Sequence, residues 1–143
     1  MVERIPPAEA KRRMDEDEWV YVDVRSIPEF EQGHPSGAYN VPLMHMGAGG
    51  MEPNADFLSV MEASFPKDAK LVLGCKSGGR SLRAAEMLEA AGWTSVVDQR
   101  AGWGGSRNPF GQVGEAGWEA AGLPTSTEAP PGRAYEDLKK KRG

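Results

Sequence analysis

The chain has 143 residues, a formal charge of −4 and an apolar fraction of 39%, which is the size and composition of one globular domain. The chain has 17 basic and 21 acidic residues, and the basic residues form no stripe. The positive charge that nonspecific nucleic-acid binding requires is therefore missing. The sequence contains no long apolar run and no apolar leader segment, and we therefore expect neither membrane insertion nor export.

The cysteine count limits the chemistry further. Cys75 is the single cysteine, which excludes an intrachain disulfide. With His34 and His45 as the two histidines, the chain is poorly equipped to bind a metal ion. We expect no metal, no cofactor and a reducing, cytoplasmic location.

Short apolar runs alternate with helical patterns as far as Val97, as in a parallel sheet that is buried on both faces. The pattern predicts an α/β domain over residues 1–124. Strands are predicted at Trp19–Val24, Tyr39–Val41, Lys70–Leu73 and Ser95–Val97, with a weaker one at Val2–Ile5. Helices are predicted at Pro7–Met14, Ser26–Gln32, Asp56–Ala63 and Arg80–Ala91.

The remaining segments are marked by glycine, proline and charge. Ser26 and Glu29 have the spacing of a capping box at the start of the second helix. Residues 118–121 predict a short helical piece before Gly122 and Pro124. Residues 125–143 contain Pro130, Pro131 and Gly132 and end in a basic run, so we expect a solvated tail.

The segment after the strand at 70–73 is the most informative for chemistry. It is a turn of six residues that leads into a helix, Cys75-Lys76-Ser77-Gly78-Gly79-Arg80. Such glycine-rich turns point backbone N–H groups inward, where they bind an anion together with the helix N-terminus. Helix N-termini and neighbouring Lys or Arg residues also lower the pKa of a cysteine. We therefore expect Cys75 to be a nucleophile rather than a space-filling core residue.

Two motifs carry a family resemblance. Residues 75–81, Cys-Lys-Ser-Gly-Gly-Arg-Ser, resemble the Cys-x-x-Gly-x-Arg-Ser active-site loop of rhodanese-like single-domain sulfurtransferases. A second signature of that family is similar to Asp23-Val24-Arg25, Glu29-Phe30, Gly33-His34, Gly37-Ala38, Asn40 and Pro42. Trp118 with residues 121–124 resembles the end of the domain, so the likeness spans about residues 3–124.

The resemblance implies a five-stranded parallel sheet flanked by helices on both faces. Cys75 would take a sulfane sulfur from thiosulfate or a similar small anionic donor, and pass it from a persulfide to cyanide, a small thiol or a protein thiol. The substrate-binding residues would be those of the loop, Lys76, Ser77, Gly78, Gly79 and Arg80. The alternative for Arg80 is a structural ion pair with a carboxylate such as Asp23 or Glu29.

The resemblance gives other residues supporting places. Asp23 and Arg25 would brace the cysteine loop, and Ser81 would support it. His34 fits a structural turn better than a catalytic base. The stretch Gln99–Gly117 departs from the family pattern as an insertion. It is either an inert loop or a rim over Cys75 formed by Trp103, Arg107 and Phe110.

Two other functions stay open. In phosphatases and arsenate reductases of the same fold, the cysteine loop follows a Cys-x5-Arg pattern. Here four residues separate Cys75 from Arg80, so the loop is one residue shorter. Rhodanese-like domains that serve as non-catalytic binding modules have lost the cysteine, and this chain retains it.

Overall fold

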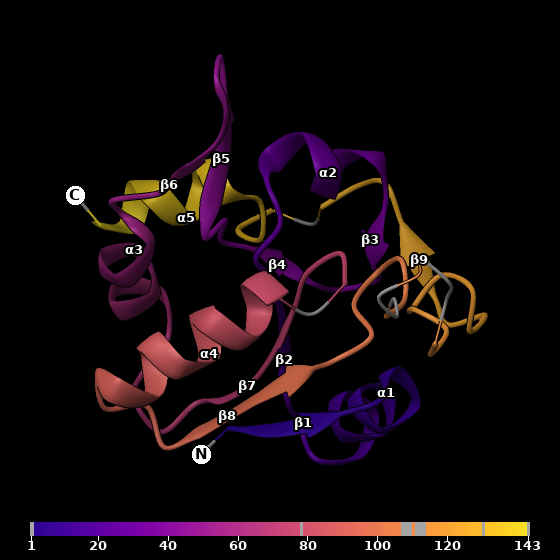
Figure 1. Cartoon of the computed structure of the whole chain (residues 1–143). Helices are drawn as coiled ribbons and strands as arrows, with labels where there is room; N and C mark the ends of the chain where they lie inside the picture. The colour runs from indigo at the N-terminus through magenta and orange to yellow at the C-terminus, as the bar shows by residue number, and fades with distance from the viewer. Residues whose placement is uncertain (1, 78, 107–109, 111–113, 130, 143) are drawn as a thin grey trace.

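The computed structural model describes residues 2–77, 79–106, 110, 114–129 and 131–142 (Figure 1). Five parallel strands form the central sheet, in the order β1 (Glu3–Ile5), β8 (Ser95–Gln99), β7 (Lys70–Gly74), β2 (Val20–Asp23) and β4 (Tyr39–Asn40). The predicted parallel sheet is confirmed, including its short first strand. Cys75 directly follows β7, so it lies at the carboxyl edge of the sheet, where open α/β folds bind ligands.

Helices cover both faces of the sheet. Leu71 and Leu73 of β7 share one buried cluster with α3 (Phe57–Ser64), α4 (Gly79–Ala90) and α5 (Tyr135–Arg142). Val72 points to the opposite cluster, which contains residues of α1 (Pro7–Glu16) and α2 (Ile27–Gln32). This alternation is the two-residue period of a strand that is buried on both sides. The predicted layered architecture is therefore confirmed (Figure 1).

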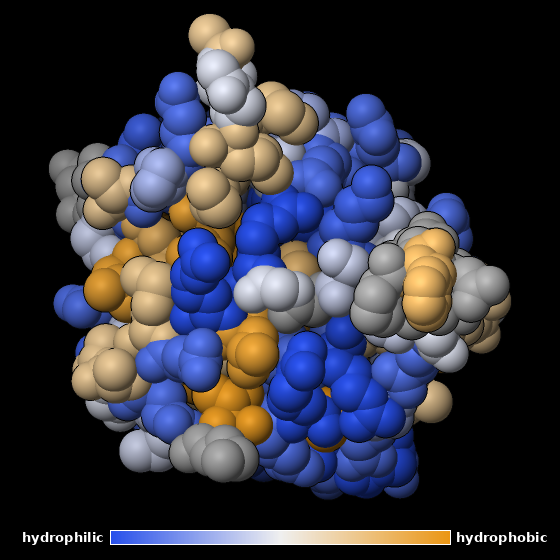
Figure 2. Space-filling model, in the orientation of Figure 1, coloured by the Kyte–Doolittle hydropathy of each residue, from blue (hydrophilic) through white to orange (hydrophobic). Residues whose placement is uncertain are grey.

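A β-hairpin occupies the segment between β4 and α3. Strands β5 (Met44–Gly47) and β6 (Gly50–Pro53) pair antiparallel, and the hairpin projects from the body of the molecule (Figures 1 and 2). The side chains of Met46 and Met51 are exposed on it. At its base, the ring of His45 lies 5.5 Å from the ring of Tyr135 in α5.

The end of the chain corrects the prediction of a solvated tail over residues 125–143. Strand β9 (Thr125–Ser126) pairs with β3 (His34–Pro35), and α5 packs on α3 with Leu138 0% exposed. The physical reason is that Tyr135 and Leu138 lie three residues apart, on one face of an otherwise charged helix. These two residues add to the core, so the described part of residues 125–142 belongs to the domain.

The short helix predicted at residues 118–121 is also wrong, since the structure has turns there. Trp118 is instead fixed by the core. Its indole packs edge-on against Tyr21 at 5.3 Å and donates a hydrogen bond to the carbonyl of Pro124. Among the described residues, no helix has the length and apolar character needed to cross a membrane.

Candidate functional site

The nucleophile predicted from the sequence lies between β7 and α4. Cys75 is 2% exposed, whereas Lys76, Ser77 and Gly79 after it are exposed. Gly78, another of the predicted loop residues, lies outside the described residues. Helix α4 begins at Gly79, four residues after Cys75, so the positive end of its dipole lies close to the cysteine loop. Lys76 and Ser77 line a surface hollow with Gly104 and Gly105.

A hydroxyl and a buried carboxylate lie behind the sulfur. Ser81 Oγ is 3.4 Å from Cys75 Sγ and 2.5 Å from Asp98 Oδ1. Asp98, which is 0% exposed, also accepts a hydrogen bond of 2.8 Å from Arg4 Nε. Burial raises the pKa of Asp98, against the opposing hydrogen bonds from Ser81 and Arg4. Sequence reasoning placed Ser81 beside the loop but missed Asp98, although this residue directly follows the strand predicted at Ser95–Val97.

Arg80 forms an ion pair, which was one of its two predicted roles. Its guanidinium donates two hydrogen bonds to the Glu29 carboxylate, at 2.8 and 3.0 Å. The same carboxylate accepts the N–H of Ser26 in the predicted capping box of α2. Burial acts to raise the pKa of Glu29, but the hydrogen bonds from Arg80 and Ser26 outweigh it and lower the pKa to about 2. The pair links α2 to the start of α4.

The Glu29–Arg80 pair predicts a pH-dependent stability. Glu29→Gln should lower the free energy of unfolding by about 1–2 kcal/mol at pH 7, because glutamine keeps the cap but not the charge. The native carboxylate has a lowered pKa, so its contribution is present above pH 4.5 and is lost as the pH falls towards about 2. Urea unfolding of both proteins between pH 7 and pH 3 should show the difference shrinking.

The matched control is Glu62→Gln, since Glu62 is exposed and lies 3.9 Å from Lys67. Exposed ion pairs contribute little to stability, so this variant should unfold like the parent at every pH. A Glu29→Gln difference that is constant with pH would contradict the assignment.

Asp23 and Arg25 form a buried pair at the end of β2. Arg25 donates to the Asp23 carboxylate, the shortest hydrogen bond being 2.6 Å, and also to the carbonyl of Gly33. The Arg25 guanidinium lies 5.0 Å from the ring centroid of Trp103. Arg25 therefore joins the end of β2, the end of α2 and the inserted segment. That it braces the cysteine loop itself stays a prediction.

The start of the inserted segment lies directly against the cysteine loop. The backbone N–H groups of Trp103 and Gly104 donate to the carbonyls of Cys75 and Lys76, at 2.7 and 2.8 Å. The Gln99 side chain fixes this segment by accepting the N–H groups of Ala101 and Gly102. Gly102 has a φ of +62°, and a Cβ on it would lie 2.4 Å from the Cys75 carbonyl oxygen. The contact therefore requires glycine at position 102.

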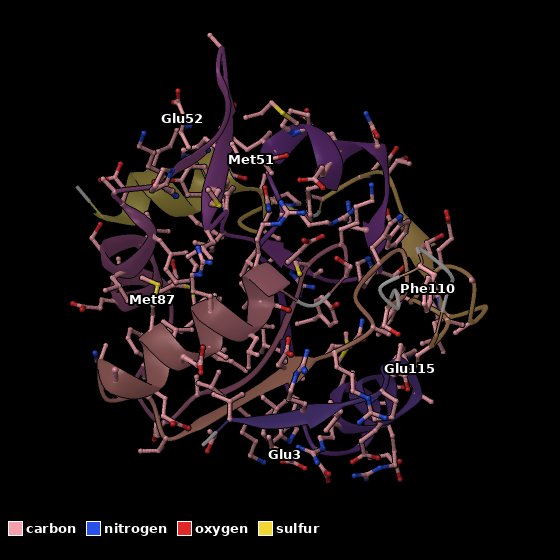
Figure 3. The ribbon with its side chains drawn as sticks, in the orientation of Figure 1. Glu3, Met51, Glu52, Met87, Phe110 and Glu115 are labelled. Atoms are coloured by element: carbon pink, nitrogen blue, oxygen red, sulfur yellow. The ribbon has the colours of Figure 1, made fainter. Side chains whose placement is uncertain are left out.

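The structure describes two of the three residues of the predicted rim, Trp103 and Phe110. Trp103 lines a hollow beside the loop together with Arg25, Glu29, Gln32 and Lys76. Phe110 is 86% exposed, and its ring lies on the outside of the molecule (Figure 3). Its place in a rim over Cys75 stays a prediction. Arg107 lies outside the described residues.

His34 has the structural role that its turn suggested. Its two ring nitrogens lie 2.7 Å from the carbonyl oxygen of Phe30 and 2.9 Å from that of Glu128. Its ring stacks on Phe30 at 3.7 Å. Across the described part of the chain, no group of three His, Cys, Asp or Glu side chains is placed to hold a metal ion.

Comparison with known proteins agrees with this geometry. The family model of the rhodanese-like domain matches residues 6–106. The chain belongs to the rhodanese-like family. The cysteine loop from Cys75 to Ser81 lies inside the matched region, as does the first part of the inserted segment. The fold class and the family resemblance inferred from the sequence are thereby confirmed.

Several relatives of this rhodanese-like domain are similar over most of its length. Thiosulfate sulfurtransferase 16, chloroplastic, from Arabidopsis thaliana is 42% identical over 105 residues, covering 73% of this chain and 78% of that protein. The senescence-associated protein DIN1 of Raphanus sativus is 39% identical over 70% of this chain, which spans 56% of that protein. The solved structure of Rv0390 from M. tuberculosis matches with a TM-score of 0.73 and 29% identity, over 89% of this chain and 98% of that one. Because some relatives are named as chloroplastic, the cytoplasmic location stays a prediction.

Proposed function

We propose that this protein is a sulfurtransferase that carries a sulfane sulfur on Cys75, from thiosulfate or a similar anionic donor to a thiol or cyanide acceptor. The observation that carries the proposal is the position of Cys75 at the carboxyl end of β7, with the Ser81 hydroxyl 3.4 Å from its sulfur. The relative named as a thiosulfate sulfurtransferase, at 42% identity, supports it.

The reaction would proceed in two displacements at sulfur. The Cys75 thiolate attacks the outer sulfur of thiosulfate, a new S–S bond forms, and sulfite leaves with the electron pair of the bond that breaks. The acceptor, a thiolate or cyanide, then attacks the terminal sulfur of the persulfide, and the Cys75 thiolate is the leaving group. Thiosulfate brings the sulfur already in its sulfane form, so the cycle needs no cofactor.

Mixing the protein with thiosulfate tests the proposal directly. A mass gain of one sulfur atom on Cys75, with release of one equivalent of sulfite, is the expected result. Failure to gain sulfur together with turnover of an aryl phosphate would favour the phosphatase alternative. Because both terminal nitrogens of Arg80 are bonded to Glu29, that arginine is poorly placed to bind phosphate. Inertness towards both substrates would favour a binding module.

Lys76 is the better candidate for attracting the anionic donor. Its side chain is exposed and lines both hollows beside the loop, whereas the charge of Arg80 is balanced by Glu29. Lys76→Ala should raise KM for thiosulfate about fivefold and weaken its dependence on salt. Transfer from the preformed persulfide to cyanide should change less, because the persulfide is already bound.

Lys139→Ala is the matched control for charge, since Lys139 is exposed on α5. It makes the same change in net charge without touching the loop, and KM for thiosulfate should stay at the parental value. An equal rise in KM for both variants would mean that net charge, and not Lys76, attracts the donor. An equal loss in both half-reactions for Lys76→Ala would mean that the loop has collapsed.

A further inference from the structure

Three side chains from three segments of the chain form a hydrogen-bonded line that begins at the sulfur of Cys75. Cys75 follows β7, Ser81 lies in the first turns of α4, and Asp98 lies near the end of β8. Ser81 Oγ is within hydrogen-bond distance of both Cys75 Sγ, at 3.4 Å, and Asp98 Oδ1, at 2.5 Å. Both Ser81 and Asp98 are 0% exposed. The carboxylate is therefore connected to the sulfur through one buried hydroxyl.

A serine hydroxyl has one proton to donate, so Ser81 cannot donate to the sulfur and to Asp98 at the same time. While Cys75 is a neutral thiol, Ser81 can donate to the Asp98 carboxylate and accept the S–H. When the sulfur is a thiolate, the hydroxyl stabilises it by turning its proton towards Sγ. The Ser81 oxygen then faces Asp98, and this contact is favourable only if Asp98 carries a proton.

We propose that Asp98 receives the thiol proton of Cys75, through the hydroxyl of Ser81, as the thiolate forms. The S–H bond breaks, the Ser81 oxygen takes that proton, and the original Ser81 proton moves to Asp98 Oδ1. The negative charge moves from the carboxylate to the sulfur, and the total charge of the three groups does not change. Asp98 acts through Ser81 and is thus a positioning residue rather than a catalytic one.

The surroundings of the line favour this proton transfer at both ends. At the carboxylate end, Asp98 faces Ser81 from α4 and Arg4 from β1, and burial raises the pKa of Asp98 despite both partners. At the sulfur end, a negative charge on Cys75 further raises the pKa of Arg80 in α4 and of Tyr21 in β2. The carboxylate of Asp23 has the same effect on both residues. Arg80 also forms an ion pair with Glu29, so its positive charge favours the anion on sulfur only in part.

The proposal predicts an unusual pH profile for the unmodified protein. Cys75 and Asp98 share one proton over a range of pH, and in that range the thiolate fraction is constant because only the position of the proton is in equilibrium. The rate of Cys75 alkylation by iodoacetamide should therefore reach a plateau in mildly acidic solution and rise again when the last proton leaves. A single smooth titration without a plateau would overturn the proposal.

Asp98→Asn tests whether the proton is shared. At a fixed pH the solvent supplies and takes up protons, so a charged carboxylate beside the thiol only disfavours the thiolate, and the asparagine variant should be alkylated at least as fast as the parent. The shared proton is visible in the shape of the profile: without a second titrating group, the plateau should disappear and alkylation should follow one smooth titration. A plateau that persists in Asp98→Asn would overturn the proposal.

Other variants provide the controls. Ser81→Ala should also remove the plateau, whereas Ser81→Thr, which keeps a hydroxyl, should restore it. Asp68→Asn changes an exposed carboxylate and should leave the profile unchanged. Circular dichroism and thermal unfolding select the variants that fold. If Asp98→Asn does not fold, the plateau of the unmodified protein still tests the proposal.

The inference rests on the proposed function only in that sulfur transfer requires a thiolate. Its test is independent of that function, because alkylation needs no sulfur donor. A plateau in a protein that gains no sulfur from thiosulfate would keep the proton transfer and overturn the sulfurtransferase. Persulfide formation without a plateau would keep the sulfurtransferase and overturn the proton transfer.

Discussion

Replacing Cys75 with serine should abolish sulfur transfer, with sulfite release falling about a thousandfold or more. A hydroxyl cannot form a persulfide. Because Cys75 is the single cysteine of the chain, no other side chain can replace its thiol. The oxygen is smaller than sulfur and has Ser81 as a hydrogen-bond partner 3.4 Å from the site of the sulfur, so the fold should survive. Mass spectrometry after incubation with thiosulfate should find no added sulfur.

Thermal unfolding of Cys75→Ser provides the control, and its midpoint should lie within a few degrees of the parental value. Residual sulfur transfer in the folded variant would show that another group is the nucleophile. Loss of the fold would instead give Cys75 a structural role, in agreement with its place in the main buried cluster.

Gly102→Ala should damage both stability and turnover. The added Cβ would lie 2.4 Å from the Cys75 carbonyl oxygen and 2.7 Å from the backbone of Lys76, at a φ of +62°. Backbone atoms cannot move aside as a flexible side chain can, so the cysteine loop must shift. We expect a loss of about 2–4 kcal/mol in the free energy of unfolding. The displaced nucleophile should lower kcat about a hundredfold in the protein that still folds.

Gly122→Ala is the matched control for backbone strain. Gly122 also has a positive φ, +76°, but a Cβ there would meet nothing within 4 Å. This variant should lose about 1 kcal/mol of stability and keep its kcat. If Gly102→Ala behaved like Gly122→Ala, the contact between the inserted segment and the cysteine loop would have no functional importance.

The sheet and its helices could be predicted because their signals are local. The continuous apolar run at 71–73 and the spacing of Ala84, Leu88 and Ala91 are readable in single segments. The strand at 95–97 was predicted too short, since the polar residues Asp98 and Gln99 that end it resemble a loop. In the structure both side chains are buried, because each has hydrogen-bond partners that no local pattern reveals.

The candidate site was predictable only in part, for the same reason. The loop from Cys75 to Ser81 is a contiguous motif, so its residue types indicated the nucleophile. The partner of Arg80 is 51 positions away in Glu29, and sequence alone left a choice between Glu29 and Asp23. The tail was misread because Tyr135 and Leu138 are two apolar residues in a charged segment, and only packing on α3 shows their contribution.

The parallel arrangement of the sheet also affects how the chain is made. Strand β1 lies at the edge of the sheet with β8 as its neighbour, and Glu3 pairs with Val97. During synthesis, β1 must therefore wait until residues 95–99 have been added before it can join the sheet. Such distant pairings slow folding and leave unpaired strands exposed to other chains. Glu3 and Arg4 place opposite charges on this waiting strand, and charged edge strands resist aggregation.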